Sequence, residues 1–265
     1  MAQNGNVLCI SNDRLKYSTE KLLGNKTGFV YYGVLDDVCT VAVKQFRKIN
    51  SETQNEFQKE CHKLCIVSKY HSNIVQIYGY QLQPIPLIIT TLYHTSLQEL
   101  LDKEKLDYDT QYSFSKQILS ALEHLHATFT IHNNLSSSNV LIDVEKKHVA
   151  LTDFGFYIKD PKLGFVNMTT EGVNKTLYRP PEQHQTYRYV DKPGDIWSFG
   201  VILYEMQHGG KSPFEKRLPF RSVSSIINGD YKKQIPEFYL NVISQCFNNN
   251  PSDRPLVRDL VKIFN

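Results

Sequence analysis

Two stretches in the first third of the chain carry residue types that bind phosphate groups. Gly24 and Gly28 lie in residues 23–30, whose spacing is that of a glycine-rich loop with Lys26 in place of its second glycine. Sixteen residues past Gly28, Lys44 ends an apolar run. Backbone amides of such a loop and a nearby cation hold nucleoside phosphates, together with Mg²⁺. The alternative is that the two glycines form a plain turn and that Lys44 is a solvated lysine. The apolar neighbours of Lys44 disfavour the solvated lysine.

The hydrophobic pattern predicts strands around these residues and helices farther on. Hairpins are predicted at residues 24–28 and 36–37, and further strands over 74–80 and 87–92. The helical spacing predicts helices over residues 51–69, 112–129, 196–207, 223–228, 239–247 and 256–264. The pattern predicts an α+β fold with a strand-rich lobe (about 15–92), a hinge (about 91–95) and a helical lobe (about 96–265). The expectation is a single domain over 1–265 with a cleft between two lobes.

Motifs along the chain resemble those of the protein kinase family, in its order and spacing. Residues 131–142 are similar to the H-R-D-L-x-x-x-N catalytic loop, Asp153-Phe154-Gly155 to the D-F-G metal loop, and Val41-Ala42-Val43-Lys44 to the V-A-I-K strand. Tyr178–Glu182 resembles the end of an activation segment. Asp195–Gly200 resembles the helix start whose aspartate braces the catalytic loop, and Arg254 matches the arginine that pairs with Glu182. The resemblance runs from about Leu22 to Phe264 and is closest to the tyrosine-kinase-like and tyrosine kinase groups.

This resemblance implies a bilobal kinase fold that uses ATP and Mg²⁺. Lys44 would hold the α/β-phosphates and pair with Glu60, with Glu52 and Glu56 as alternatives on the same predicted helix. Thr90 resembles the gatekeeper, and Leu92 lies in the hinge. The residues assigned to the nucleotide are Gly24, Lys26, Gly28, Val30, Ala42, Lys44, Glu60, Thr90, Leu92 and Leu141. Asn139 and Asp153 match the two metal ligands.

The catalytic loop departs from the family pattern at three positions. Asn134 stands at the place of the catalytic aspartate, and its amide has no group that titrates near neutral pH. Ser136 replaces a lysine that often contacts the γ-phosphate, and Asn133 replaces an arginine that clamps a phosphorylated activation segment. Loss of general-base help costs about 10²–10⁴ in rate. The catalytic set is therefore Asn134, Ser136 and Asp153, with phosphoryl transfer expected to be weak or absent.

These departures affect residues that take part in phosphoryl transfer, whereas the residues that bind the nucleotide are retained. The sequence therefore predicts a pseudokinase, which is an Mg-ATP-binding regulatory module in signalling. Asn134 in this setting resembles the pseudokinase domains of Janus kinases. Three alternatives stay open. The chain could be an active Ser/Thr or Tyr kinase with an unusual loop, or an active kinase knocked out by an engineered Asp-to-Asn change, against which Asn133 and Ser136 argue. It could also be a nucleotide-independent scaffold, which Lys26 and Lys175 favour.

Composition narrows the class of partner. The formal charge of +3 is too small to indicate nucleic acid or a membrane surface. No apolar run is long enough for a membrane span, and the first ten residues lack the pattern of a signal peptide. Five scattered cysteines indicate reduced structural thiols. We expect a cytoplasmic, or at least intracellular, domain of its own or of a larger protein, whose partner is a protein substrate or a regulated protein.

Overall fold

The chain forms two compact units. The computed structural model describes residues 9–24, 29–46, 51–82, 85–154, 157–160, 164–167, 177–185, 191–213 and 235–265. Unit 1 comprises Met1–Tyr93 with Gly155–Gly172, and unit 2 comprises His94–Phe154 with Val173–Asn265. Lys26, Gly28, Lys175 and the helix predicted over 223–228 lie outside the described residues.

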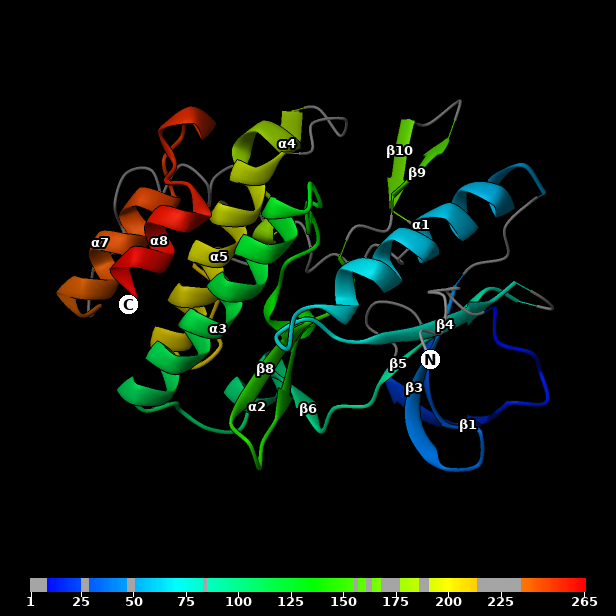
Figure 1. Cartoon of the computed structure of the whole chain (residues 1–265). Helices are drawn as coiled ribbons and strands as arrows, with labels where there is room; N and C mark the ends of the chain where they lie inside the picture. Colours follow the sequence, from blue (N-terminus) through cyan, green and yellow to red (C-terminus); the bar gives the residue numbers. More distant parts are fainter. Residues whose placement is uncertain are drawn as a thin grey trace. The chain divides into compact units, whose positions relative to one another are not determined.

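Unit 1 is built on a five-stranded antiparallel sheet with the strand order β1-β2-β3-β5-β4. The strands are β1 (Leu15–Gly24), β2 (Phe29–Leu35), β3 (Cys39–Gln45), β4 (Ile77–Gln81) and β5 (Leu87–Thr91). A long helix, α1 (Ser51–Lys69), and a hairpin of β9 (Tyr157–Asp160) and β10 (Gly164–Asn167) complete its described part (Figure 1). The strand predicted over 74–80 begins only at Ile77, because a turn closed by the Ile74 amide and the His71 carbonyl (3.1 Å) precedes it.

The β2–β3 turn has the left-handed backbone that a tight hairpin requires. Asp36 has φ 53° and Asp37 has φ 59°, as in type I′ turns, where short polar residues tolerate this conformation. The Val38 amide donates to the Leu35 carbonyl at 3.2 Å and closes the turn. Arg14 donates to both carboxylate oxygens of Asp36, at 2.7 and 2.6 Å. The predicted turn at 36–37 is therefore confirmed.

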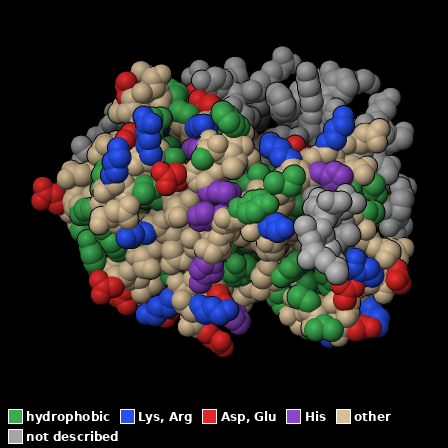
Figure 2. Space-filling view, viewed as in Figure 1, with side chains coloured by type: hydrophobic (Ala, Val, Ile, Leu, Met, Phe, Trp, Pro, Cys, Tyr) green, Lys and Arg blue, Asp and Glu red, His purple; other side chains and the backbone are tan. Residues whose placement is uncertain are grey.

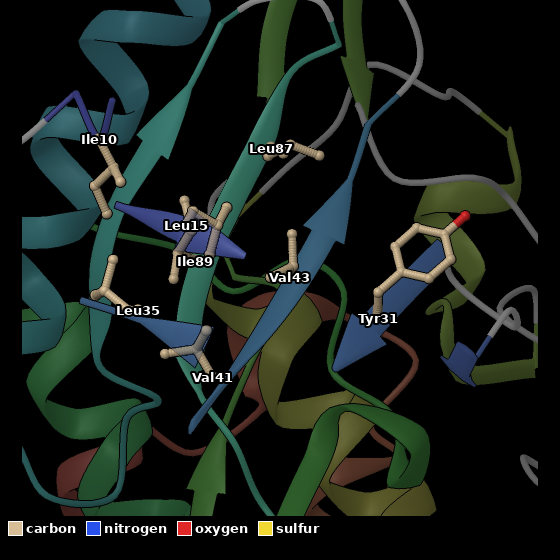
Figure 3. Packing of buried hydrophobic residues seen from close by; sticks show 8 residues of the cluster. All are labelled: Ile10, Leu15, Tyr31, Leu35, Val41, Val43, Leu87 and Ile89. Atoms are coloured by element: carbon tan, nitrogen blue, oxygen red, sulfur yellow. The ribbon is translucent and has the colours of Figure 1, made fainter. Parts of the chain in front are cut away.

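One hydrophobic cluster of unit 1 lies on one face of this sheet. Side chains alternate across a strand, so every second residue of β2, β3 and β5 reaches this face. Figure 3 shows the cluster, which consists of Ile10, Leu15, Tyr31, Leu35, Val41, Val43, Leu87 and Ile89. Helix α1 buries its predicted apolar side, including Phe57, Cys61 and Leu64. Phe57 packs against Phe46 with ring centroids 5.3 Å apart, which fixes α1 to the end of β3.

Unit 2 is mostly helical. Its helices are α2 (Leu97–Leu101), α3 (Tyr108–Ala127), η1 (Ser137–Asn139), α4 (Pro181–Gln185), α5 (Lys192–Gln207), α7 (Glu237–Cys246), η4 (Pro251–Asp253) and α8 (Val257–Ile263). A small sheet has the order β6-β7-β8, with β6 (Thr95–Ser96), β7 (Val140–Asp143) and β8 (His148–Leu151). Helix α5 is buried along most of its length and packs against α3 and α7 (Figure 1). The expected α+β fold, with a strand-rich first part and a helical second part, is confirmed.

The visible surface carries charges of both signs. Figure 2 shows Lys and Arg side chains interspersed with Asp and Glu over the described part of this face, in keeping with the formal charge of +3. Within the described ranges, no helix is both long and apolar enough to cross a membrane.

Candidate functional site

Four predicted nucleotide residues share one face of the sheet of unit 1. The strand register pairs Val30 with Lys44, and Ala42 with Thr90. Lys44 and Ala42 are two residues apart on β3, so all four side chains lie on the same face. This is the face opposite to the apolar cluster of Figure 3, because the core residues Val41 and Val43 alternate with them. The structure thus brings these four residues together.

Lys44 is largely buried, and an aromatic ring lies beside its cation. The residue is 8% exposed, and its Nζ atom lies 5.7 Å from the centroid of the Phe46 ring. The Glu60 carboxylate lies 3.4 Å from the Lys63 Nζ, within the same helix. Burial raises the pKa of Glu60, and the Lys63 cation opposes that rise. Pairing of Glu60 with Lys44 stays a prediction.

The other predicted contact residues are distributed over both units. Gly24 is the last residue of β1, and Leu92 follows β5 and is half-buried. In unit 2, Leu141 is a half-buried residue of β7, and Ser136 is buried in the catalytic loop.

A buried carboxylate on α5 holds the start of the catalytic loop. Asp195 lies in the first turn of α5 and is 1% exposed. Its Oδ2 accepts from the His132 amide at 2.9 Å, and its Oδ1 accepts from the Asn133 amide at 2.7 Å. His126 Nε2 lies 2.8 Å from Oδ2. These bonds hold Asn133 at a left-handed φ of 50°. The expectation that Asp195 braces this loop is confirmed.

The two predicted metal ligands are tied to the same loop. Asn139 Nδ2 donates to the Asn134 carbonyl at 2.6 Å, which leaves Oδ1 as the side-chain atom for a cation. The Thr152 amide donates to the Asn139 carbonyl at 3.0 Å and so joins the loop to the segment entering Asp153. Asp153 has φ 62°, a conformation that aspartate tolerates better than most residues. An amide oxygen and a carboxylate are the hard donors that Mg²⁺ prefers, so the residues fit this ion.

Asn134 makes a bond that an aspartate could not make. Its Nδ2 donates to the Asp153 carbonyl at 3.2 Å, and the residue is 8% exposed. A carboxylate has only acceptor oxygens, so an aspartate here would face the Asp153 carbonyl without a proton to share. The amide thus joins the catalytic loop to the metal loop. Sequence reasoning missed this role, because an amide in place of an acid indicates lost chemistry and does not name a new partner.

A second buried carboxylate of α5 contacts the loop and the end of the activation segment. The Ser137 hydroxyl donates to Glu205 Oε2. The Tyr178 hydroxyl lies 2.9 and 2.8 Å from the two Glu205 oxygens, and it accepts from the Ser137 amide at 3.4 Å. Burial raises the pKa of Glu205 to about 7, with the two hydroxyls lowering it and Asp102 adding a small rise. Burial, and then the Glu205 charge, raises the pKa of Tyr178.

Two further contacts fix the segment that follows Tyr178. Gln183 Nε2 donates to Asn133 Oδ1 at 3.3 Å, so an uncharged amide meets the residue that replaces the expected arginine. Arg254 donates to both oxygens of Glu182 at 2.7 and 2.8 Å, and its guanidinium lies 5.0 Å from the Trp197 ring centroid. The predicted Glu182–Arg254 pair is confirmed, and it supports the fold without bearing on phosphate transfer.

Three of the five cysteines, Cys61, Cys65 and Cys246, are buried. All five are free thiols, and burial raises the pKa of Cys65 and that of Cys246 to about 12 each. In the part of the chain that the structure describes, no group of three or more His, Cys, Asp or Glu side chains is placed to hold a metal ion.

Comparison with known proteins agrees with these motifs. Residues 18–264 match the family described as protein tyrosine and serine/threonine kinase. The dual specificity protein kinase pyk3 of Dictyostelium discoideum is 28% identical over 250 residues, which is 91% of this chain and 18% of that protein. Human tyrosine-protein kinase TXK is 28% identical over 247 residues (89% of this chain, 45% of that protein). Human tyrosine-protein kinase FRK is 27% identical over 260 residues (94% of this chain, 50% of that protein).

The chain spans half or less of the length of these relatives. Because the family match covers nearly the whole chain, the protein belongs to the protein tyrosine and serine/threonine kinase family.

Proposed function

We propose that this chain binds Mg-ATP, transfers phosphate weakly or not at all, and acts as a pseudokinase that regulates a protein partner in signalling. The observation that carries the proposal is the bond from Asn134 Nδ2 to the Asp153 carbonyl. The residue at the catalytic position joins two loops, and it has no group that takes up a proton near neutral pH.

Family membership supports the nucleotide half of the proposal, because protein kinases in general use ATP and Mg²⁺ and act on proteins. Lys44 would hold phosphate oxygens, and Val30, Ala42 and Thr90 share its face of the sheet. Asn139 and Asp153 would hold Mg²⁺, which neutralises phosphate charge when bound. We further propose a cytoplasmic location, since free thiols are typical of a reducing compartment.

An active kinase is the second candidate. The bond to Asp153 uses the Nδ2 of Asn134 and leaves Oδ1, an acceptor that could orient a substrate hydroxyl. Lys44, Asn139 and Asp153 are all present, so this reading requires only that orientation without a base be enough for slow transfer. The names of the relatives include tyrosine and dual-specificity kinases.

Thermal unfolding with and without Mg-ATP tests the binding half. A ligand at 100 times its Kd should stabilise the folded state by about 2.7 kcal/mol. The matched variant is Asp153→Ala, which removes a metal ligand and should reduce the stabilisation by Mg-ATP. If no nucleotide shifts the melting temperature of the parent, the chain is a nucleotide-independent scaffold and the proposal is wrong.

Transfer of a radiolabelled γ-phosphate tests the catalytic half. The parent, Asn134→Asp and Asn134→Asp/Asp153→Ala should be compared at the same high enzyme concentration. We expect transfer by Asn134→Asp to exceed that of the parent by about 10²-fold or more, because a general base returns. The double variant should be silent. Transfer by the parent that equals that of Asn134→Asp, and that disappears when Asp153→Ala is introduced into the parent and assayed beside it, would establish the active-kinase alternative.

A further inference from the structure

We propose that Ser137 is a positioning residue for the metal end of the nucleotide site. It would act by holding the catalytic loop to Glu205, so that Asn139 presents its side-chain oxygen to Mg²⁺. The inference rests on the proposed binding of Mg-nucleotide. Neither the sequence motifs nor the family match assigns a role to this serine.

Ser137 is fixed from both its side chain and its backbone. It is fully buried, its hydroxyl donates to Glu205 Oε2, and its amide lies 3.4 Å from the Tyr178 hydroxyl. A hydrogen bond to a charged carboxylate is stronger than one between neutral groups. The loop is therefore held at this serine by bonds to two different segments, α5 and the end of the activation segment.

The position of Ser137 is passed on directly to Asn139. Both residues belong to the single turn η1, in which the Asn139 amide donates to the Ser136 carbonyl at 2.9 Å. The Asn139 side chain in turn donates to the Asn134 carbonyl at 2.6 Å. Because one short turn carries both residues, a shift of Ser137 would move the Asn139 oxygen.

The two contacts with α5 hold the loop at two points along one helix. Asp195, in the first turn of α5, accepts the amides of His132 and Asn133. Glu205, in its last turn, accepts the Ser137 hydroxyl. The carboxylates are ten residues apart on the helix, a rise of about 15 Å. Asn134 lies between the two points at which the loop is attached to α5. Asn139 lies in the turn that begins at the second of these points, Ser137.

Among the described residues, three groups change the pKa of the Glu205 carboxyl. They are the hydroxyls of Ser137 and Tyr178, which donate to it, and the charge of Asp102. Replacing Ser137 by alanine removes one of two hydroxyl donors from a buried carboxylate. The Tyr178 bond remains, so Glu205 keeps one partner. We therefore expect the variant to fold and the loop to lose its second attachment.

The test compares Ser137→Ala with Ser138→Ala by calorimetric titration of ADP, once with Mg²⁺ and once with EDTA. Ser138 is the next residue of the same turn and is only half-buried, so it is a matched control. We expect Ser137→Ala to lose about tenfold in affinity for Mg-ADP, with the affinity for metal-free ADP unchanged. Ser138→Ala should match the parent in both titrations.

Each other outcome counts against the inference. If Ser137→Ala binds Mg-ADP as tightly as Ser138→Ala, the positioning role is wrong and the proposed function stands. If the variant loses Mg-ADP and metal-free ADP affinity equally, Ser137 is merely structural. If the parent itself binds no Mg-ADP, the proposed function fails and the inference fails with it.

Hydrogen exchange gives a second readout that does not need a ligand. The Asn139 amide should exchange about tenfold faster in Ser137→Ala than in Ser138→Ala, since a loosened turn opens more often. Equal exchange in the two variants would show that the Glu205 contact does not hold the turn.

Discussion

The two ends of the catalytic loop are attached to the same helix in different ways. At the first end, Asp195 accepts backbone amides of His132 and Asn133. At the second end, Glu205 accepts hydrogen bonds from the side-chain hydroxyls of Ser137 and Tyr178. A backbone amide is present whatever the side chain, so the first attachment tolerates substitution at Asn133, whereas the second depends on residue type. The backbone attachment lets the loop keep its shape although Asn133, Asn134 and Ser136 depart from the family pattern.

Removal of Asp195 should have the largest effect. Asp195→Ala would leave two buried amides and His126 without their common acceptor. Loss of one partner from a buried charged network typically costs about 3–5 kcal/mol. Urea unfolding of the parent and variant would measure the change. A loss below about 1 kcal/mol would mean that the backbone attachment does not support the loop.

The second attachment should respond to pH through Glu205. Burial raises the pKa of this carboxyl from 4.5 to about 7. Between these values the folded protein binds more protons than the unfolded chain, so the free energy of unfolding falls as the pH rises through this window. Glutamine does not titrate. The stability of Glu205→Gln relative to the parent should therefore rise between pH 4.5 and 8, by roughly 3 kcal/mol.

Urea unfolding of the parent and Glu205→Gln at several pH values would measure this difference. Asp195→Asn is the matched control at the other end of α5. A difference between parent and Glu205→Gln that stays constant from pH 4.5 to 8 would contradict the raised pKa.

Tyr178→Phe should have an intermediate effect. The change removes a hydroxyl that contacts Glu205 and the Ser137 amide, and it keeps the buried ring. Leaving a buried carboxylate with one hydroxyl donor fewer should cost about 1–3 kcal/mol. Chemical unfolding together with the corresponding Ser137→Ala/Tyr178→Phe double variant would show coupling between the two residues. Strict additivity would indicate that they do not share Glu205.

The smallest effect is expected at Asn133. Asn133→Gly keeps the amide that donates to Asp195 and accepts the left-handed φ of 50° without strain. It removes the half-buried bond from Gln183. We expect a loss of about 1 kcal/mol or less in unfolding experiments. A loss as large as that of Tyr178→Phe would overturn the distinction between backbone and side-chain attachment.

Much of the fold could be predicted from residue patterns. The spacing of Phe57, Cys61 and Leu64 predicts the buried side of α1, and this side is the one that the structure buries. The nearly uncharged run after Asp195 predicts a central helix, which α5 is. Such patterns are reliable here because they depend on local periodicity, and burial of one helix side requires no knowledge of the partner.

The bonds within the site could not be predicted in this way. Ser137 and Glu205 are 68 residues apart, and Asn134 and Asp153 are 19 apart. A lone serine or asparagine matches many partners, and only the packing of the loop on α5 selects one. The sequence shows at Asn134 the loss of an acid, and the structure adds that the amide of this residue is a donor.

The sequence by itself determined the family, the strand-rich first part and helical second part of the fold, and the identity of the departures, because motifs and periodicity are properties of neighbouring residues. It also determined that position 134 carries no titratable acid. Only the tertiary structure decided that a second buried carboxylate of α5, Glu205, attaches the catalytic loop through side chains, whereas Asp195 attaches it through backbone amides. The physical reason is that a buried carboxylate must find donors, and the folded chain decides which donors reach it.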